Sequence, residues 1–293
     1  MKKFTAVVVV ILMIVSALTA CGKPVIEPTH AKNTESPAPV DNDSNHTPPI
    51  DNTGEKKLKI GLVTSVSGLG DKSFNDQSYA GVTKAVQEFG LEMDYVEPQD
   101  FSDIEPYLTE FAKAGIYDVI IGIGYDSAQP IKKVAPQYPD QKFLLVDNPV
   151  HDMSNVASLT FNKSEEGFLT GIFCAYFINM NQIEVSGKSI SLDNSKKVVG
   201  AILGVENPDI VEALAGFRAG LKYIDPEIKV LYSAIGSWTD QNKARELAMA
   251  QYGGGAAMVW QDAGNAGLGI FKAAADKDLF TLGWNSTQHE MDP

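Results

Sequence analysis

Residues that can bind a small molecule recur in this sequence directly after its apolar segments. Carboxylates and amides exchange hydrogen bonds with hydroxyl groups, aromatic faces stack on flat bases or on sugars, and glycine lets the backbone approach a ligand closely. The residues in question are Asp71, Asp147, Trp238, Asp262, Gly264 and Asn285. They suit a small neutral ligand with several hydroxyl groups, such as a nucleoside or a sugar. A phosphate would require a Lys or Arg, which no strand end supplies.

Three of these residues also have an ordinary structural explanation. Asp147 can cap the segment that follows it, Trp238 can belong to the core, and Asp71 can cap the N-terminus of the next helix. Two glycine patterns, Gly68-x-Gly70-x-x-Ser73 and Gly264-x-x-Gly267-x-Gly269, suggest phosphate loops, but neither has the full dinucleotide spacing. We therefore expect no nucleotide cofactor, and no other cofactor.

The elements that must position these residues alternate between strand and helix. Short apolar runs at 58–66, 91–96, 117–123 and 142–146 alternate with helical patterns at 73–89, 102–114 and 128–135. The pattern restarts with strands at 156–161, 197–203, 228–235, 256–260 and 279–284 and helices at 164–180, 208–223, 240–252 and 266–276. Such alternation predicts doubly wound α/β layers, here as two similar lobes. In open α/β sheets, ligands bind beyond the carboxyl ends of the strands.

The N-terminal twenty residues have the pattern of an export signal. Lys2 and Lys3 precede an uncharged apolar run that ends in Leu18-Thr19-Ala20-Cys21. This ending is typical of a bacterial lipobox, in which the Cys21 thiol takes the lipid. The alternative is an uncleaved anchor helix, and both interpretations place the remainder outside the cytoplasm. We expect residues 1–20 to be a signal peptide and Cys21 to anchor the protein in the cell membrane, on its extracytoplasmic face.

The segment that follows the anchor is rich in proline and polar residues. Residues 21–57 contain six prolines and no aromatic residue. A segment of this kind cannot bury enough apolar surface to offset the entropy of ordering it. We expect a disordered tether that separates the folded lobes from the membrane.

The composition excludes several classes of function. The formal charge is −13 and no Lys/Arg cluster relieves it, so nucleic acid is not an expected partner. Two cysteines do not make a disulfide framework, and Cys174 lies in an apolar helical pattern where it reads as a buried small residue. The four histidines are scattered, so no metal site is expected.

Several spaced motifs together resemble one known family. Asp71, Phe74 and Asn75, followed by Tyr79 and Gly81, are similar to the first-helix signature of the basic membrane protein family, the substrate-binding lipoproteins of ABC transporters. The later stretches FNKSEEGFLTGIFCAYF and NPDIVEALAGFRAGLKYIDPEIKV resemble the family as well. The resemblance covers essentially all of residues 58–288.

The resemblance implies a periplasmic-binding-protein type I fold that closes around its ligand. It implies an N-terminal lobe at 58–160, a C-terminal lobe at 161–284 and a hinge between them. Carried over to this sequence, Tyr79 and Trp238 would sandwich a base, Asp71 and Asp147 would contact hydroxyls or the base, and Gly264 would offer its backbone. Phe74 and Asn75 belong to the same motif, although Phe74 can also be a packing residue.

The sequence departs from the family pattern in two places. Asn285 stands where the family usually has an aspartate that contacts ribose, which removes a charge-assisted hydrogen bond. Asp262 stands where a small residue is common, and it either compensates for Asn285 or indicates a different ligand. Residues 285–293 begin a return to the first lobe that family members continue for some tens of residues. We therefore expect a fragment or a divergent copy.

The residues and the resemblance together favour a receptor over an enzyme. The favoured function is a lipid-anchored receptor that hands a nucleoside, preferably a purine nucleoside, to an ABC transporter permease without chemistry. One alternative is a nucleoside or glycoside hydrolase with Asp71 and Asp147 as acid and base. Another is a sensor, or a sugar-binding member of the same fold.

Overall fold

The structure, a computed structural model, describes residues 57–185, 187–285 and 288. Residues 48–293 form one compact unit, and the description below concerns that unit alone. The predicted signal peptide, the lipidation site Cys21 and the tether up to residue 56 lie outside the described residues. So do most residues after 285. In the described part of the chain, no helix combines the length and the apolar character that crossing a bilayer requires.

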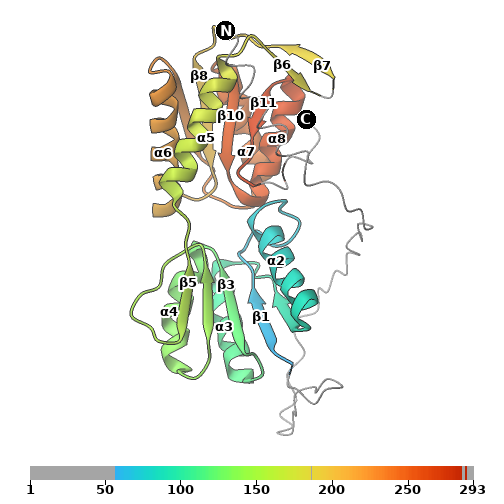
Figure 1. The fold of residues 1–293 in the computed structure, drawn as a ribbon, viewed down its shortest axis with the longest axis vertical. Helices are drawn as coiled ribbons and strands as arrows, with labels where there is room; N and C mark the ends of the chain where they lie inside the picture. The colour runs from blue at the N-terminus through green and yellow to red at the C-terminus, as the bar shows by residue number, and fades with distance from the viewer. Residues whose placement is uncertain (1–56, 186, 286–287, 289–293) are drawn as a thin grey trace. The chain divides into compact units, whose positions relative to one another are not determined.

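The first lobe is built on a five-stranded parallel sheet with the order β2-β1-β3-β4-β5 (Figure 1). Its strands are β1 (Lys59–Val63), β2 (Glu92–Val96), β3 (Val119–Ile123), β4 (Phe143–Val146) and β5 (Val156–Leu159). Its helices are α2 (Phe74–Phe89), α3 (Phe101–Ala114) and α4 (Ala128–Val134). The 3-10 turns η1 (Tyr125–Ser127) and η2 (Ala135–Gln137) flank α4.

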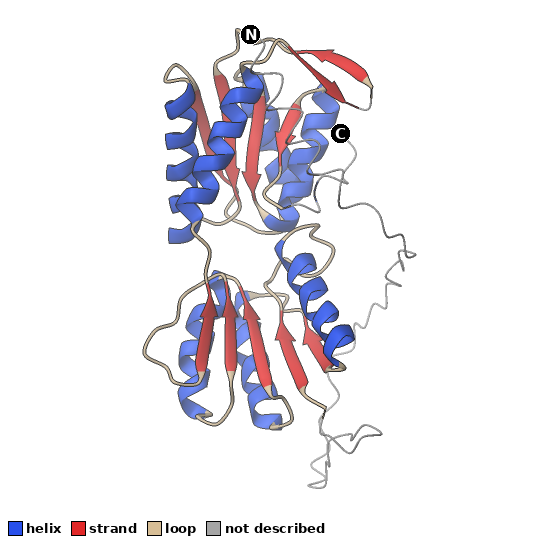
Figure 2. Ribbon diagram, in the orientation of Figure 1, coloured by secondary structure: helices blue, strands red, loops and turns tan. Residues whose placement is uncertain are grey.

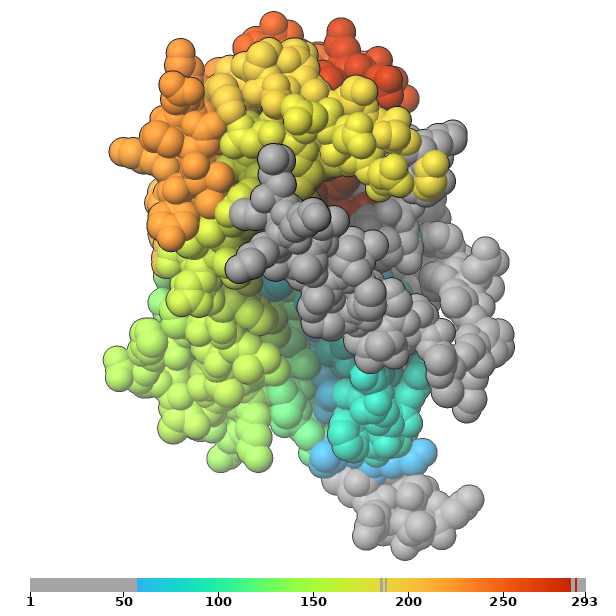
Figure 3. All heavy atoms as spheres, turned by 45° about the horizontal axis from the view of Figure 1, so that its top comes forward, coloured from blue at the N-terminus to red at the C-terminus, as the bar shows by residue number. Residues whose placement is uncertain are grey.

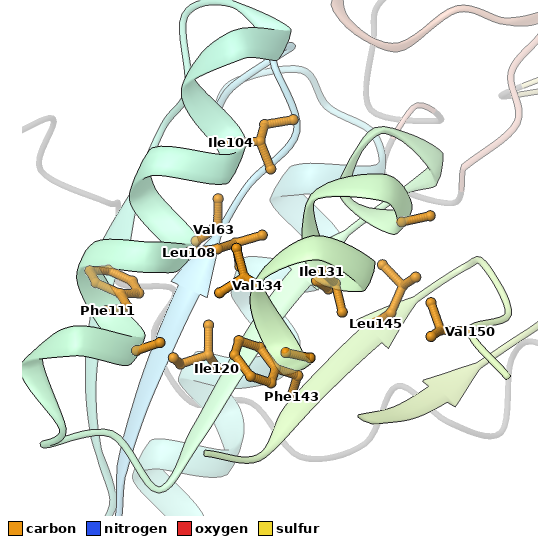
Figure 4. Packing of buried hydrophobic residues seen from close by; sticks show 13 residues of the cluster. Val63, Ile104, Leu108, Phe111, Ile120, Ile131, Val134, Phe143, Leu145 and Val150 are labelled. Carbon is orange, nitrogen blue, oxygen red and sulfur yellow. The ribbon is translucent and has the colours of Figure 1, made fainter. Parts of the chain in front are cut away.

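The two faces of this sheet are covered differently. On one face α3 and α4 pack their buried side chains, among them Ile104, Leu108 and Ile131, against Val63 and Phe143 of the strands (Figure 4). On the other face α2 packs over Leu62, Ile121 and Ile123. Because successive strand residues point to opposite faces, Leu62 and Val63 serve the two layers separately.

The second lobe is built on a four-stranded parallel sheet with the order β11-β10-β8-β9. Its strands are β8 (Val198–Leu203), β9 (Lys229–Ala234), β10 (Met258–Asp262) and β11 (Phe280–Leu282). Helices α5 (Lys163–Ile178) and α6 (Pro208–Ile224) cover one face, and α7 (Gln241–Gly253) and α8 (Gly267–Lys277) cover the other (Figure 2). The 3-10 turn η3 (Gly264–Ala266) precedes α8.

Glycines let α5 and α6 approach each other closely. Gly167 and Gly171 of α5 face the backbone of α6, and Gly216 and Gly220 of α6 face the backbone of α5. A Cβ atom added at any of the four would overlap a backbone carbonyl oxygen of the opposite helix. Each helix therefore carries two glycines four residues apart at the contact. This close contact holds the N-terminal halves of α5 and α6 next to each other.

An antiparallel hairpin that the sequence did not predict follows α5. It consists of β6 (Gln182–Val185) and β7 (Lys188–Ser191). Figure 3 shows this hairpin in yellow beside α5, whose outer side chains Leu169, Phe173 and Tyr176 are exposed. Elsewhere the predicted order of strands and helices agrees with the structure, with small shifts at the ends: β11 ends at Leu282 instead of residue 284, and α5 begins one residue early, at Lys163.

Candidate functional site

A cavity lies at the carboxyl ends of the strands, as the α/β rule predicts. Its atom-free volume is about 650 Å³, including the part that is open to solvent. The first lobe lines it with the loop after β1, the start of α2, and the residues after β3 and β4. The second lobe lines it with the starts of α5 and α6 and the residues after β9, β10 and β11.

The structure brings most of the predicted ligand-binding residues together at this cavity. The lining residues include Asp71, Phe74, Asp147, Trp238, Asp262, Gly264 and Asn285. The other two predicted residues, Asn75 and Tyr79, do not line it.

Asp71 caps α2 and organises the loop before it. Its Oδ1 accepts hydrogen bonds from the backbone N–H of Ser73 (2.8 Å) and Asp76 (3.2 Å). Its Oδ2 accepts from the backbone N–H and the side-chain amide of Asn75, both at 3.1 Å. Burial raises the pKa of Asp71 although these hydrogen bonds favour the charged form. Because protein donors occupy both oxygens, the capping explanation fits Asp71 better than a direct ligand contact does.

Asn75 is fully buried and ties the same loop to the helix. Its Oδ1 accepts from the backbone N–H of Ser65 (2.9 Å), and its Nδ2 donates to the hydroxyls of Ser65 (2.9 Å) and Ser67 (2.6 Å). Ser65 and Ser67 line the cavity, so Asn75 acts on the site through these two serines.

Tyr79 lies away from the cavity, in the packing between α2 and the sheet. Its ring meets that of Tyr95 edge-on at 5.0 Å, and it joins the cluster around Leu62. Phe74, five residues earlier on α2, lines the cavity instead. Both rings also contact the cluster around Leu62, so the difference between them is that Phe74 reaches the cavity as well.

Trp238 and Trp284 bring indole rings to the cavity from the second lobe. The Trp238 ring lies so close to Gly204 that a Cβ atom there would overlap it. The Trp238 carbonyl oxygen accepts a hydrogen bond from the backbone N–H of Ala266 (2.8 Å), which anchors the loop after β9. Trp284 packs against Trp260 with ring centroids 5.6 Å apart. Trp284 lines the cavity but is not among the residues predicted from the sequence.

Lys163 lines the cavity although the sequence did not predict it as a site residue. It is the first residue of α5, and its side chain is 12% exposed. Its Nζ lies 2.9 Å from Asp147 Oδ1 and 3.3 Å from Glu166 Oε2. Burial disfavours the Lys163 ammonium, but the attraction of Asp147 and Glu166 outweighs it and raises the lysine pKa. The strand ends of the sequence carry no Lys or Arg, whereas Lys163 is the first residue of a helix.

Asp147 is held in an unusual backbone conformation next to this lysine. Its φ of 75° lies in the left-handed region, which aspartate adopts more readily than most residues. Its backbone N–H donates to Leu159 O at 2.8 Å, which ties it to β5. Burial raises the pKa of Asp147 even though Lys163 favours its charged form.

Two carboxyl groups at the cavity have no hydrogen-bond partner within the described part of the chain. Asp126 follows β3, and burial raises its pKa to about 6. Asp262 ends β10, and burial raises its pKa to about 7, assisted by Asp147 and Glu166 and opposed by Lys163. Both side chains are only partly buried, and a carboxyl group that is partly removed from water and has no protein donor can accept hydrogen bonds from a ligand.

Direct polar contacts join the two lobes beside the cavity. Asn148 Nδ2 donates to Asp209 Oδ2 at 2.6 Å, and Asn285 Nδ2 donates to Ser73 Oγ at 2.5 Å. The Lys163–Asp147 pair is a third such contact. Asn285 is therefore engaged with the first lobe. Contacts of this kind join residues far apart in the chain, which is why sequence patterns alone did not reveal Asn148 and Asp209.

Among residues 57–185, 187–285 and 288, no three His, Cys, Asp or Glu side chains come together as metal ligands. Cys174 is buried in the second-lobe core, where burial raises its pKa to about 12. The predicted reading of Cys174 as a small core residue agrees with this position.

Comparison with known proteins gives one consistent family. Residues 57–291 match the family model described as "ABC transporter substrate-binding protein PnrA-like". A lipoprotein of Pyrococcus abyssi described as uncharacterized is 30% identical over 229 residues, which cover 76% of this chain and 54% of that protein. The "ABC transporter nucleoside-binding protein BmpA" of Lactococcus lactis is 30% identical, covering 80% of this chain and 61% of that protein.

A solved structure extends the comparison to the fold. The solute-binding protein of an ABC transporter system from Aeropyrum pernix superposes with a TM-score of 0.67 at 26% identity, covering 77% of this chain and 61% of that one. This similarity confirms the predicted fold class, the periplasmic-binding-protein type I fold. The chain spans about half the length of the archaeal relatives it matches.

Proposed function

The chain belongs to the family of PnrA-like substrate-binding proteins of ABC transporters, and from this premise we propose that it is a receptor that binds a nucleoside in the cavity described above. A purine nucleoside is the favoured ligand, and an ABC permease is the partner that receives it. The name of the Lactococcus lactis relative, a nucleoside-binding protein of an ABC transporter, supports the ligand class.

One observation carries this proposal: rings and unpartnered carboxyl groups from both lobes share one cavity. Phe74 of the first lobe and Trp238 of the second supply the faces between which a base can stack. In this assignment Phe74 takes the role that the family resemblance gave to Tyr79. Asp126 and Asp147 accept hydrogen bonds from ribose hydroxyls, and Gly264 contributes its backbone.

The ligand-bound protein is proposed to hold its two lobes together around the nucleoside. The lobes comprise residues 58–160 and 161–284. The contacts Asn148–Asp209 and Asn285–Ser73 would then add to the closed arrangement. A ligand that contacts both lobes stabilises the closed state by its differential affinity for it.

The same premise argues against catalysis. The family consists of substrate-binding proteins and not of enzymes. Asp71 and Asp147 were the candidates for a hydrolytic acid and base, but protein donors occupy Asp71 and Lys163 pairs with Asp147.

We further propose that the protein is held at the extracytoplasmic face of the cell membrane by a lipid on Cys21. The lipobox at residues 18–21 supports this, and so do the relatives from three Pyrococcus species that are named lipoproteins. Mass spectrometry of the membrane-extracted chain checks it. Loss of residues 1–20 together with a diacylglyceryl mass on Cys21 is expected, and an unmodified N-terminus contradicts the anchor.

A calorimetric titration tests the ligand class. The full chain, purified in mild detergent and dialysed to remove carried-over ligand, is titrated with adenosine, guanosine, inosine, cytidine, uridine, ribose and galactose. Micromolar or tighter binding of nucleosides together with weak binding of ribose is expected. Preference for a bare sugar would move the protein to the sugar-binding alternative. Nucleoside binding in cells that lack a cognate permease would instead support a sensor.

A further inference from the structure

The inference concerns Gly204, the residue that follows β8. Its backbone lies outside the left-handed region that favours glycine, so alanine could adopt the same conformation. What requires glycine here is space. A Cβ atom at this position would lie 2.4 Å from Cε3 and 2.5 Å from Cζ3 of the Trp238 indole. The next neighbour, the Ala263 Cα, would lie 3.2 Å away, so the indole is the main obstacle.

Hydrogen bonds fix the backbone of Gly204 between two neighbouring strand ends. Its N–H donates to the Asp262 carbonyl oxygen at the end of β10 (2.8 Å). Its carbonyl oxygen accepts from the N–H of Gly236, which lies after β9 (2.8 Å). Gly204 is also buried. A retreat of this backbone from the indole would therefore strain both hydrogen bonds.

The backbone of the loop that carries Trp238 is fixed as well. The loop begins at Gly236, whose N–H is bonded to Gly204, and the Trp238 carbonyl oxygen accepts from the Ala266 N–H (2.8 Å). The loop is thus held on both sides of the tryptophan. A side chain added at position 204 would therefore turn the Trp238 ring about its side-chain torsions, because neither backbone is free to move.

The Trp238 indole also reaches the cavity. Trp238 lines the cavity, and Gly204, against which its ring lies, does not. An indole displaced from Gly204 either enters the cavity or turns away from it. Both movements remove the flat face on which a base can stack.

We propose that Gly204 is a positioning residue for ligand binding, because it lets the Trp238 indole lie where a base stacks on it. The inference rests on the proposed nucleoside-binding function, since the position of the indole matters for binding only when a base enters the cavity. It predicts that positions 204 and 238 are coupled. A smaller ring at position 238 should weaken binding next to glycine and strengthen binding next to alanine.

The test is a cycle of four full-length chains: the original, Gly204→Ala, Trp238→Phe and the double variant. Each is titrated calorimetrically with inosine, adenosine and uridine. For the nucleosides that the original chain binds, we expect Gly204→Ala to weaken binding at least about tenfold and Trp238→Phe about threefold. The double variant should bind more tightly than Gly204→Ala, because phenylalanine is smaller and keeps a stacking face. Gly253→Ala in α7 is the control, since an added Cβ meets nothing within 4 Å there.

The outcomes distinguish this inference from the proposed function. Unchanged nucleoside binding by Gly204→Ala overturns the inference, and so does a Trp238→Phe change that weakens binding equally next to glycine and next to alanine. Absence of nucleoside binding by the original chain overturns the proposed function, and the role of Gly204 in stacking with it. If Gly204→Ala is recovered unfolded, the double variant is expected to fold and to bind nucleoside, and its failure in either respect overturns the inference.

Discussion

The two lobes contribute comparable parts of one cavity, but they hold their site residues by different means. In the second lobe the helices next to the site are fixed by apolar packing: α5 buries Gly167, Gly171, Cys174, Ala175 and Ile178 against α6 and the sheet. In the first lobe, α2 buries a single residue, and that residue is Asn75. Its position depends on hydrogen bonds to Asp71, Ser65 and Ser67.

The difference predicts how each half of the site fails. Close packing is intolerant of added volume and indifferent to hydrogen-bond chemistry. A buried polar network is sensitive to the loss of a hydrogen-bonding group, because removal of one partner leaves the others unsatisfied. The free energy of unfolding should therefore fall most when methyl groups are added between α5 and α6 in the second lobe, and when a side-chain amide next to α2 is removed in the first lobe.

The largest effect is expected from separating α5 and α6. A Gly216→Val side chain would meet the backbone of α5 at Ser164 and Phe168, next to Lys163. We expect the free energy of unfolding to fall by at least about 3 kcal/mol. Urea denaturation followed by circular dichroism measures it. Gly81→Ala on α2 is the control, since nothing lies within 4 Å of an added Cβ there and a small gain in stability is expected.

The second test removes the polar anchor of the first lobe. Asn75→Ala leaves the Ser65 N–H without its acceptor and removes one of the donors to the Asp71 carboxylate. We expect a loss of about 2–3 kcal/mol in the free energy of unfolding and weaker nucleoside binding. Asn194→Ala provides the comparison, because Asn194 hydrogen-bonds to Asn181 on the surface. Similar losses in the two variants would contradict the role of the Asn75 network.

The contrast between the lobes also explains what the sequence could predict. Asp147, Trp238 and Asp262 follow apolar strands, and the rule for parallel sheets brings such residues together whatever the details of packing. Lys163 and Phe74 stand at helix starts, where their direction depends on which helix face is buried. That face is decided by contacts with distant residues, such as Gly216 for α5 and Leu62 for α2.

The choice between Phe74 and Tyr79 illustrates the limit. Both are aromatic residues of α2, and the spacing alone leaves the helix free to turn either toward the cavity. In the structure the Asp71 and Asn75 hydrogen bonds hold the start of α2 at the cavity, where Phe74 lies, while Tyr79, about one and a half turns later, meets Tyr95. Both rings also pack on the cluster around Leu62, so an apolar pattern alone does not distinguish them.

The third test compares one ring from each lobe. Trp238→Ala and Phe74→Ala should each weaken nucleoside binding by about 1–3 kcal/mol, because each removes one stacking face. Tyr79→Ala should leave the affinity nearly unchanged while it lowers stability, since its ring packs against Tyr95. Calorimetric titration and thermal unfolding of the three variants separate these effects. A loss of affinity in Tyr79→Ala equal to that in Phe74→Ala would restore the sandwich that the family resemblance implied.

The smallest effect concerns the two open carboxyl groups, Asp126 of the first lobe and Asp262 of the second. Their pKa values rise from 3.8 to about 6 and to about 7, so the folded protein binds more protons than the unfolded chain between these limits. Their contribution to the free energy of unfolding is therefore complete below about pH 4 and is lost as the pH rises through the folded pKa.

Substitution of each carboxyl group tests this pH dependence in the ligand-free protein. Asp262→Asn should gain up to about 1–2 kcal/mol relative to the original chain as the pH rises above about 5, and Asp126→Asn should gain less. Urea titrations at several pH values supply the measurement. Burial is the largest cause of both pKa shifts: at Asp262 it is opposed by Lys163 and assisted by Asp147 and Glu166, whereas at Asp126 it acts alone. An equal gain of the two variants at every pH would contradict the larger rise in the pKa of Asp262.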